Sequence, residues 1–190
     1  MYQVSQIPIR DFYYLRYSRQ TLICEKKNFF PVSVHRPVKF EGTAFATSHF
    51  EQCPARNAFF EPIGGGTWLS GQQGVFPQRI WFQWADGVQI VPAKVGFSNR
   101  MACGSPGNGH YGNCFGQSAK SFNIIGSQDC INWETLRKVN WAKFAKPNLF
   151  RSWPIWWRNQ AAFQCVGIEF ESSKSGEYVT ARNIHIWENA

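Results

Sequence analysis

Hydrophobic and polar residues alternate in many short stretches of this chain, and the period of an amphipathic helix is scarce. Alternation bounded by turn residues is typical of strands that bury one face. Strands of the number and length found here suit two packed sheets, so the sequence predicts an all-β, antiparallel β-sandwich. The predicted strands are 38–47, 79–85, 89–98, 121–127, 133–139, 162–171 and 181–188.

The same alternation predicts which side chains face the core. In 162–171 it directs Val166, Ile168 and Phe170 inward. In 79–85 large residues occupy both faces, so we expect this strand to be covered on both sides. His185 is expected to face outward or to lie at a sheet edge.

Composition adds two features to this picture. The nine Trp and 17 Phe residues exceed what an ordinary core requires. We expect most of them in the core, but amphipathic rings are also favoured where a surface meets a sugar, a lipid interface or a partner. The formal net charge of +8 should attract polyanions such as sulfated glycans, acidic lipid or nucleic acid. Basic residues are concentrated early, and we predict a basic N-terminal extension, 1–36, packed on a domain of 37–190.

The six cysteines form an even set without the paired spacing of a structural zinc site. This pattern favours disulfides and an oxidising compartment, whereas buried free thiols in a cytosolic protein are the alternative. The predicted bonds are Cys24–Cys53, Cys103–Cys114 and Cys130–Cys165. The second pair brackets a Gly- and Asn-rich loop that can turn back on itself.

Membrane and targeting signals are the next consideration. No apolar run approaches the length of a membrane span, and the first ten residues lack the apolar centre of a signal peptide. We interpret the chain as a secreted, extracellular protein in a mature form that begins at an added methionine. An intracellular protein is the alternative.

Six segments share their order and spacing of hydrophobic residues, Gly and Trp with a known family. They are "FATSHFEQCPARNAFF", "GGGTWLS", "PQRIWFQWADGVQIVPAKVGF", "FNIIGSQDCINWETL", "AFQCVGIEFE" and "NIHIWE". From about Phe45 to Glu188 the chain thereby resembles the discoidin domain, also called the coagulation factor V/VIII C-type domain, of the galactose-binding-like superfamily. The resemblance implies a jelly-roll sandwich in which the turn Gly126–Asp129 and Trp133 belong to the scaffold.

The resemblance also bears on cofactors. Many relatives in that family hold a structural calcium with an Asp near the first corner and a Glu in the last strand. Here the corner reads Asn57 to Glu61, and Asn183 stands at the position expected for the glutamate. We therefore expect no cofactor, and the alternative is calcium held by Glu61 with backbone carbonyls of 64–67.

No arrangement typical of catalysis is present in the sequence. The histidines His35, His49, His110 and His185 lie far apart, and nucleophile-elbow, phosphate-loop, zinc-protease and dinucleotide motifs are absent. The glycines of "IGGGTW" are interpreted as a tight corner because no helix is predicted after them. We therefore predict that the protein is not an enzyme.

In the discoidin family the ligand meets loops at one end of the sandwich, which here would be 47–57, 64–78 and 98–118. Planar polar groups beside an aromatic ring suit sugar recognition. The candidates in these loops are His49, Arg56, Arg100, Asn108, His110 and Tyr111. We expect Arg100 and His110 to grip hydroxyls while Tyr111 stacks on the sugar ring. The alternative is that the Asn and Gly residues of 98–118 serve only its turns.

A second aromatic cluster lies in "FRSWPIWWRNQ", where Trp153, Trp156 and Trp157 stand between Arg151 and Arg158. It could form a sugar platform or a membrane-inserting spike, with Trp156 and Arg158 as candidate ligand contacts, or it could be internal packing. The function predicted from all these features is a non-enzymatic, lectin-like module that binds glycans. The alternatives are an anionic phospholipid surface binder and a protein-binding adhesive or structural module. Nucleic acid is not expected, because no recognised binding module accompanies the charge.

Overall fold

The computed structural model describes residues 14–18, 21–25, 35–51, 53–60, 66–99, 114–155 and 161–189. The chain divides into two compact units, Met1–Ser33 and Val34–Ala190. In the first unit, β1 (Tyr14–Ser18) and β2 (Thr21–Glu25) form an antiparallel hairpin. Packing of the basic extension on the domain stays a prediction.

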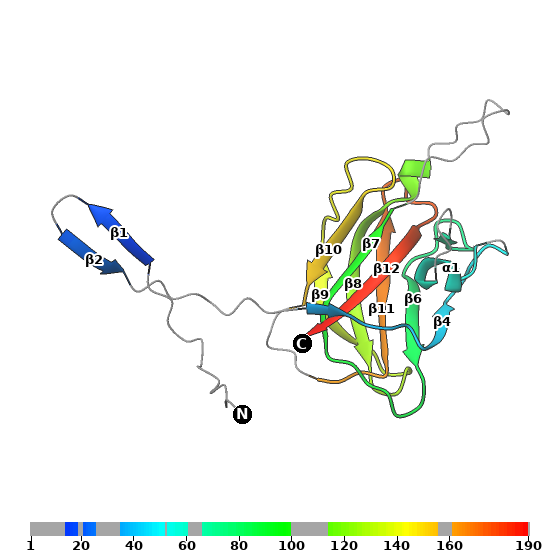
Figure 1. The fold of residues 1–190 in the computed structure, drawn as a ribbon. Helices are drawn as coiled ribbons and strands as arrows, with labels where there is room; N and C mark the ends of the chain where they lie inside the picture. The colour runs from blue at the N-terminus through cyan, green and yellow to red at the C-terminus, as the bar shows by residue number, and fades with distance from the viewer. Residues whose placement is uncertain are drawn as a thin grey trace. The chain divides into compact units, whose positions relative to one another are not determined.

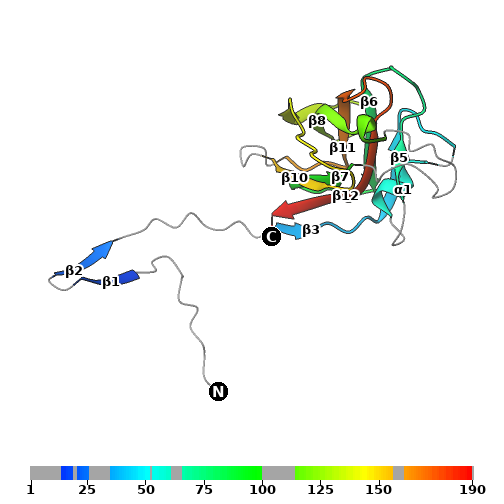
Figure 2. The same cartoon turned by 90° about the horizontal axis from the view of Figure 1, so that it is seen from above.

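The second unit is a sandwich of two antiparallel sheets, as predicted (Figures 1 and 2). One sheet has the order β10-β7-β12-β3, and β5 pairs with β12 beside it. Its strands are β3 (His35–Pro37), β5 (Trp68–Leu69), β7 (Pro92–Ser98), β10 (Phe150–Pro154) and β12 (Thr180–Asn189). The other sheet has the order β4-β6-β11-β8-β9. Its strands are β4 (Gly42–Ala46), β6 (Gln78–Trp84), β8 (Ala119–Ser127), β9 (Glu134–Val139) and β11 (Cys165–Ser173).

Each predicted strand region overlaps one of these strands, whereas β3, β5 and β10 were not predicted. Two short helices, α1 (Arg56–Phe59) and the 3-10 helix η1 (Cys114–Gln117), lie in the connections. None of the helices in the described part of the chain is long and apolar enough to cross a membrane.

The core lies between the two sheets and is rich in aromatic rings. Val166, Ile168 and Phe170 of β11 are fully buried, which confirms the predicted inward face of that strand. Phe97 of β7 packs against rings from four other segments, among them Phe122 at 5.3 Å and Phe170 at 5.7 Å between centroids. Full burial of one such side chain contributes about 1.5–3 kcal/mol. Aromatic packing between the sheets therefore accounts for a large part of the unusual Phe content.

Trp153 belongs to this core and not to a ligand-binding loop. It lies in β10, is only 7% exposed, and its ring is 4.8 Å from that of Phe122 and 5.1 Å from that of Phe97. Of the explanations considered for the Trp153–Trp157 cluster, internal packing is therefore correct for Trp153. Residues 156–160, including Trp156, Trp157 and Arg158, lie outside the described residues.

The cysteines follow the predicted pairing in part. Cys130 and Cys165 form a disulfide, as predicted, with their Cα atoms 5.4 Å apart. Cys114 is disulfide-bonded, but Cys103 lies outside the described residues, so the Cys103–Cys114 pairing stays a prediction. Cys53 has no disulfide partner within the second unit, and Cys24 belongs to the first unit. The Cys24–Cys53 bond, which would join the two units, therefore stays a prediction.

Candidate functional site

Loops from both sheets meet at one end of the sandwich. The antiparallel registers place the last residues of β4, β7 and β11 at the same end as the first residues of β6, β8, β10 and β12 (Figure 1). The connections at this end include the described parts of 47–57, 64–78 and 98–118, the three loops that the resemblance indicated. The segment 174–179 between β11 and β12 joins them there.

Hydrogen bonds hold the first two of these loops together. The Ser48 hydroxyl donates to Gln78 Oε1 at 2.6 Å and accepts from the Gly71 amide at 3.0 Å. The indole of Trp68 donates to the Ser48 carbonyl at 2.9 Å. A Cβ at Gly71 would lie 2.7 Å from the carbonyl oxygen of His49, so only glycine lets the two segments cross this closely. The backbone of His49 is thereby held in one position beside β5.

Phe50, the residue after His49, forms an aromatic pair with Tyr178 next to this crossing. The rings of Phe50 and Tyr178 lie 5.3 Å apart at 60°, and Phe50 is 42% exposed. Beside them, Gln73 Nε2 donates to Glu177 Oε1 at 3.3 Å, and the Gly74 amide donates to the Glu177 carbonyl at 2.9 Å. We call Phe50, Gln73, Glu177 and Tyr178 the loop-end cluster. It combines apolar ring surface with a planar amide and a carboxylate, the groups that sugar recognition uses.

The third loop is clamped at its base. Asn99 is completely buried, its amide nitrogen donates to Ser118 Oγ and to the Lys146 carbonyl at 3.0 Å each, and its oxygen accepts from the Leu149 amide at 2.7 Å. Asn99 is therefore a scaffold residue.

Lys174 lies beside this base. Its ammonium donates to the Phe144 carbonyl at 2.6 Å and lies 3.8 Å from the centroid of the Phe115 ring. Desolvation by burial lowers the pKa of Lys174.

The predicted site residues are placed only in part. His49 and Arg56 are exposed, the former at the crossing with Gly71 and the latter at the start of α1. Arg100, Asn108, His110 and Tyr111 lie outside the described residues, as do Trp156 and Arg158. β10, which precedes 156–160, ends at Pro154 at the opposite end of the sandwich from the loop-end cluster.

The members of the loop-end cluster were not among the predicted site residues. Phe50 does fall in a predicted loop, and the turn residues of "SSKSGEY" mark the loop that holds Glu177 and Tyr178. Those signals locate the loops without showing that they meet.

The structure also bears on metal binding. Within the described residues, no group of three or more His, Cys, Asp and Glu side chains could hold a metal ion. Glu61 and residues 62–65 lie outside the described ranges, so the calcium alternative at that corner is untested.

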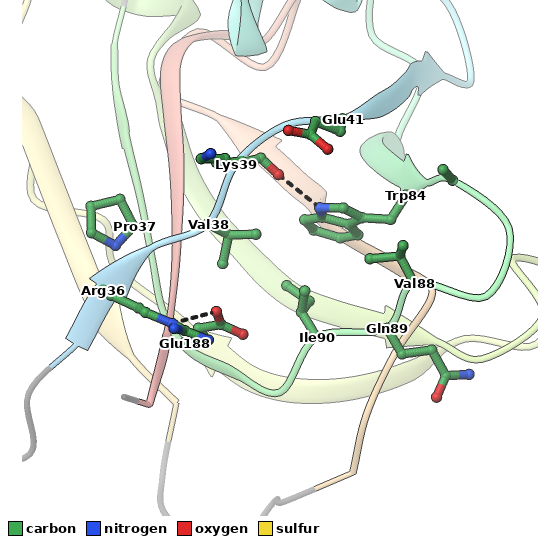
Figure 3. A pocket seen from close by; sticks show the side chains of 11 residues that line it. Arg36, Pro37, Val38, Lys39, Glu41, Trp84, Val88, Gln89, Ile90 and Glu188 are labelled. Carbon is green, nitrogen blue, oxygen red and sulfur yellow. Dashed lines mark hydrogen bonds and ion pairs between the residues drawn. The ribbon is translucent and has the colours of Figure 1, made fainter.

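A pocket lies at the other end of the sandwich, where β6 and β12 end (Figure 3). Its volume is about 480 Å³, and Val38, Trp84 and Ile90 give it an apolar wall. Two hydrogen bonds lie in its wall: Arg36 Nε donates to Glu188 Oε1 at 2.8 Å, and Trp84 Nε1 donates to the Lys39 carbonyl at 3.0 Å. The side chains of Lys39, Glu41 and Gln89 also line it. We take the loop-end cluster as the candidate site because it lies among the loops that the resemblance indicated.

Comparison of the sequence with protein-family models gives no match, and comparison with curated protein sequences gives none. Solved structures do match. The family 32 carbohydrate-binding module of C. perfringens NanJ, in complex with galactose, has a TM-score of 0.61 at 16% identity and covers 82% of this chain and 100% of that chain.

Two further structures are similar. Chitosan-binding module 1 of a chitosanase/glucanase from Paenibacillus sp. IK-5 has a TM-score of 0.58 at 17% identity, covering 80% of this chain and 98% of that chain. The family 32 module of AlyQ, in complex with 4,5-unsaturated mannuronic acid, has a TM-score of 0.57 at 14% identity, with the same coverage of 80% and 98%. The chain shares the antiparallel β-sandwich fold of these modules. At these identities the likeness shows the fold alone, and the resemblance to the discoidin family in particular stays a prediction.

Proposed function

We propose that this chain is a non-enzymatic, lectin-like carbohydrate-binding module whose loop-end cluster holds a glycan. The observation that supports the proposal best is the pairing of the exposed Phe50 ring with the half-buried Tyr178 ring beside the Gln73–Glu177 hydrogen bond. A pyranose ring has an apolar face of C–H groups and a rim of hydroxyls. The rings would pack against that face, and the amide and carboxylate would bind hydroxyls.

The fold supports the same proposal. Similar solved structures include modules whose names state that they bind galactose, 4,5-unsaturated mannuronic acid or chitosan. The exposed side chains of His49 and Arg56 add planar donors on the first loop. Arg100, Asn108, His110 and Tyr111 remain candidate contacts in the third loop, whose clamped base would reduce the ordering cost of binding.

We also propose an extracellular location. The Cys130–Cys165 disulfide is typical of proteins that fold in an oxidising compartment. The alternative of lipid-surface binding depended on the Trp153–Trp157 cluster, and the burial of Trp153 weakens this alternative. Binding to an extracellular protein remains the outcome to examine if no glycan binds.

A glycan array that holds neutral, amino and acidic sugars tests the proposal, followed by calorimetry of the best neutral ligand. Phe50→Ala and Tyr178→Ala should each weaken binding about tenfold, which corresponds to about 1.4 kcal/mol of lost ring contact. Gln73→Ala removes one hydrogen bond and should cost about two- to tenfold.

Phe45→Ala is the matched control, because Phe45 is exposed to a similar degree, 38%, on a different surface of the molecule. It should bind like the wild type. An array without hits, or equal affinities of Phe50→Ala and the control, would show that the loop-end cluster does not bind glycans.

A further inference from the structure

The outer face of the β10-β7-β12-β3 sheet carries a ring cluster that the loop-end cluster does not involve. In the register of this sheet, Phe150 lies opposite Ser98, His185 opposite Gly96, and Trp187 opposite Lys94. The rings of Phe150 and His185 lie 5.6 Å apart, and those of His185 and Trp187 are stacked at 5.6 Å and 29°. The intervening Ile184 and Ile186 are buried in the core, so the three rings belong to the outward side.

Gly96 explains why these rings lie close to the sheet. A Cβ at Gly96 would lie 2.6 Å from Cζ of Phe150 and 2.9 Å from Cβ of Ser152. The missing side chain leaves room for the Phe150 ring to extend across β7. Phe150 is nevertheless 41% exposed, and His185 is exposed as well. The sheet therefore presents ring surface to solvent on a rigid backbone.

Charge on this face is positive. The Lys94 ammonium lies 4.2 Å from the centroid of the Trp187 ring. Among the described residues, no carboxylate forms an ion pair with Lys94, and the outward positions of β7, β10 and β12 that surround the rings hold no Asp or Glu. The nearest acidic residue along β12, Glu188, pairs with Arg36 at 2.8 Å. We call Lys94, Phe150, His185 and Trp187 the cationic face.

We infer that the cationic face is a second binding surface, which takes an acidic glycan. The inference rests on the proposed glycan-binding function and names a ligand class for a different part of the molecule. The C–H face of a pyranose packs on the rings, and its carboxylate or sulfate accepts hydrogen bonds from the Lys94 ammonium, which is held in place by Trp187. The exposed imidazole of His185 lies beside the same carboxylate or sulfate.

Several observations favour an acidic glycan over other polyanions. The face is aromatic and carries the Lys94 ammonium, which matches one acidic group on a sugar ring. Nucleic-acid binding draws its affinity from many phosphate contacts. A lipid surface requires apolar side chains that can insert, whereas these rings pack against the sheet and one another.

The test measures binding of the full chain to four immobilised probes: an oligogalacturonate, a heparin oligosaccharide, the best neutral glycan from the array, and single-stranded DNA. Lys94→Gln should weaken binding to the oligogalacturonate and the heparin oligosaccharide about tenfold or more, and leave neutral binding unchanged. His185→Gln should weaken acidic binding by a smaller factor. Lys138→Gln is the matched control, because Lys138 is exposed on β9 of the other sheet.

The outcomes separate this inference from the proposed function. In one outcome Phe50→Ala weakens binding of the neutral glycan, and Lys94→Gln weakens acidic binding no more than Lys138→Gln does. This outcome overturns the inference and leaves the loop-end proposal intact. If binding of the acidic glycans depends on Lys94 and not on Phe50, the inference is supported. If, in addition, no neutral glycan binds, the result counts against the loop-end site. A larger effect of Lys94→Gln on DNA than on both acidic glycans also overturns the inference. Failure to bind any glycan refutes both.

Discussion

The two outer faces of the sandwich are built alike and differ in how their charges are used. On each face an aromatic residue lies close to a glycine of a neighbouring strand: the ring of Phe150 approaches Gly96 on the cationic face, and Trp81 lies opposite Gly167 on the other sheet. On the second face Arg79 forms an ion pair with Glu169, and its guanidinium lies 5.1 Å from the centroid of the Trp133 ring. We call Phe45, Arg79, Trp81, Trp133 and Glu169 the paired face.

The rings of the paired face pack against one another. Phe45 stacks on Trp81 at 5.6 Å and 18°, and Trp133 meets the same indole edge to face at 5.6 Å. Trp133 follows a loop that the Cys130–Cys165 disulfide attaches to β11. The polar and cationic partners of these rings thus come from within the protein. The comparison shows that Arg79 has an acidic partner on its own face, whereas among the described residues no carboxylate forms an ion pair with Lys94.

The disulfide is the strongest internal support of the paired face. The double substitution Cys130→Ser and Cys165→Ser should lower the free energy of unfolding by about 3–4 kcal/mol, the chain-entropy value for the sequence separation of 35 residues. Denaturant titration measures the loss, and near-ultraviolet circular dichroism should report a changed environment of Trp133.

Cys53→Ser is the control for this variant, because Cys53 forms no disulfide within the second unit. It should change stability by less than about 0.5 kcal/mol. A double variant as stable as this control would mean that packing alone holds the loop.

The two glycines should respond differently to a methyl group. A Cβ at Gly167 would lie 2.4 Å from the Ile80 carbonyl oxygen, whereas the atom nearest to a Cβ at Gly96 is Cζ at the far end of the Phe150 side chain. The atoms held by the backbone at Gly96, Ser152 Cβ and the Arg151 carbonyl oxygen, would lie farther away, at 2.9 and 3.0 Å. Gly167→Ala should therefore destabilise by about 3 kcal/mol and Gly96→Ala by about 1 kcal/mol. Thermal unfolding of the two variants side by side measures the difference, and equal losses would refute this account of the paired face.

Charge removal should also distinguish the faces. Arg79→Gln leaves the partly buried Glu169 without its ion pair and should cost about 1–2 kcal/mol of stability. Lys94→Gln removes only a cation over a ring and should cost less than about 1 kcal/mol. Chemical denaturation gives both values. If Lys94→Gln proved the more destabilising, Lys94 would be a structural residue and the cationic face would lose its main ligand group.

The smallest expected effect concerns the loop that leads to Trp133. Asp129 accepts hydrogen bonds from the amides of Asn132 and Ile131, from the side-chain amide of Asn132 and from Ser127 Oγ, and these bonds lower its pKa. A lowered pKa in the folded state contributes stability above the unfolded value of about 3.9, and this stability is lost as the pH falls further.

The melting temperature of the wild type should therefore fall between about pH 5 and pH 2 more steeply than that of Asp129→Asn. Ser127→Ala, which removes one of the four hydrogen bonds, should give an intermediate slope. Parallel slopes for all three proteins would mean that Asp129 does not contribute to the acid sensitivity of the fold.

Local pattern alone determined much of the sandwich. Alternation in β11 identified its inward side chains, and His185 lies on the exposed side of β12 as expected. These predictions succeeded because successive side chains of a strand point to opposite faces whatever the neighbouring strand is. The Cys130–Cys165 bond was also predicted correctly.

Only the tertiary structure decided which distant segments meet. β10 has a short, irregular pattern, and Trp153 is buried because the strand pairs with the edge of β7. Phe50 and Tyr178 are far apart in the chain and are brought together by the crossing at Gly71 and the turn before β12. The same holds for the pairing of Arg79 with Glu169 and the position of Lys94 over Trp187. Alternation acts within one strand, whereas such contacts depend on strand order and register, which are set by the packing of the whole domain.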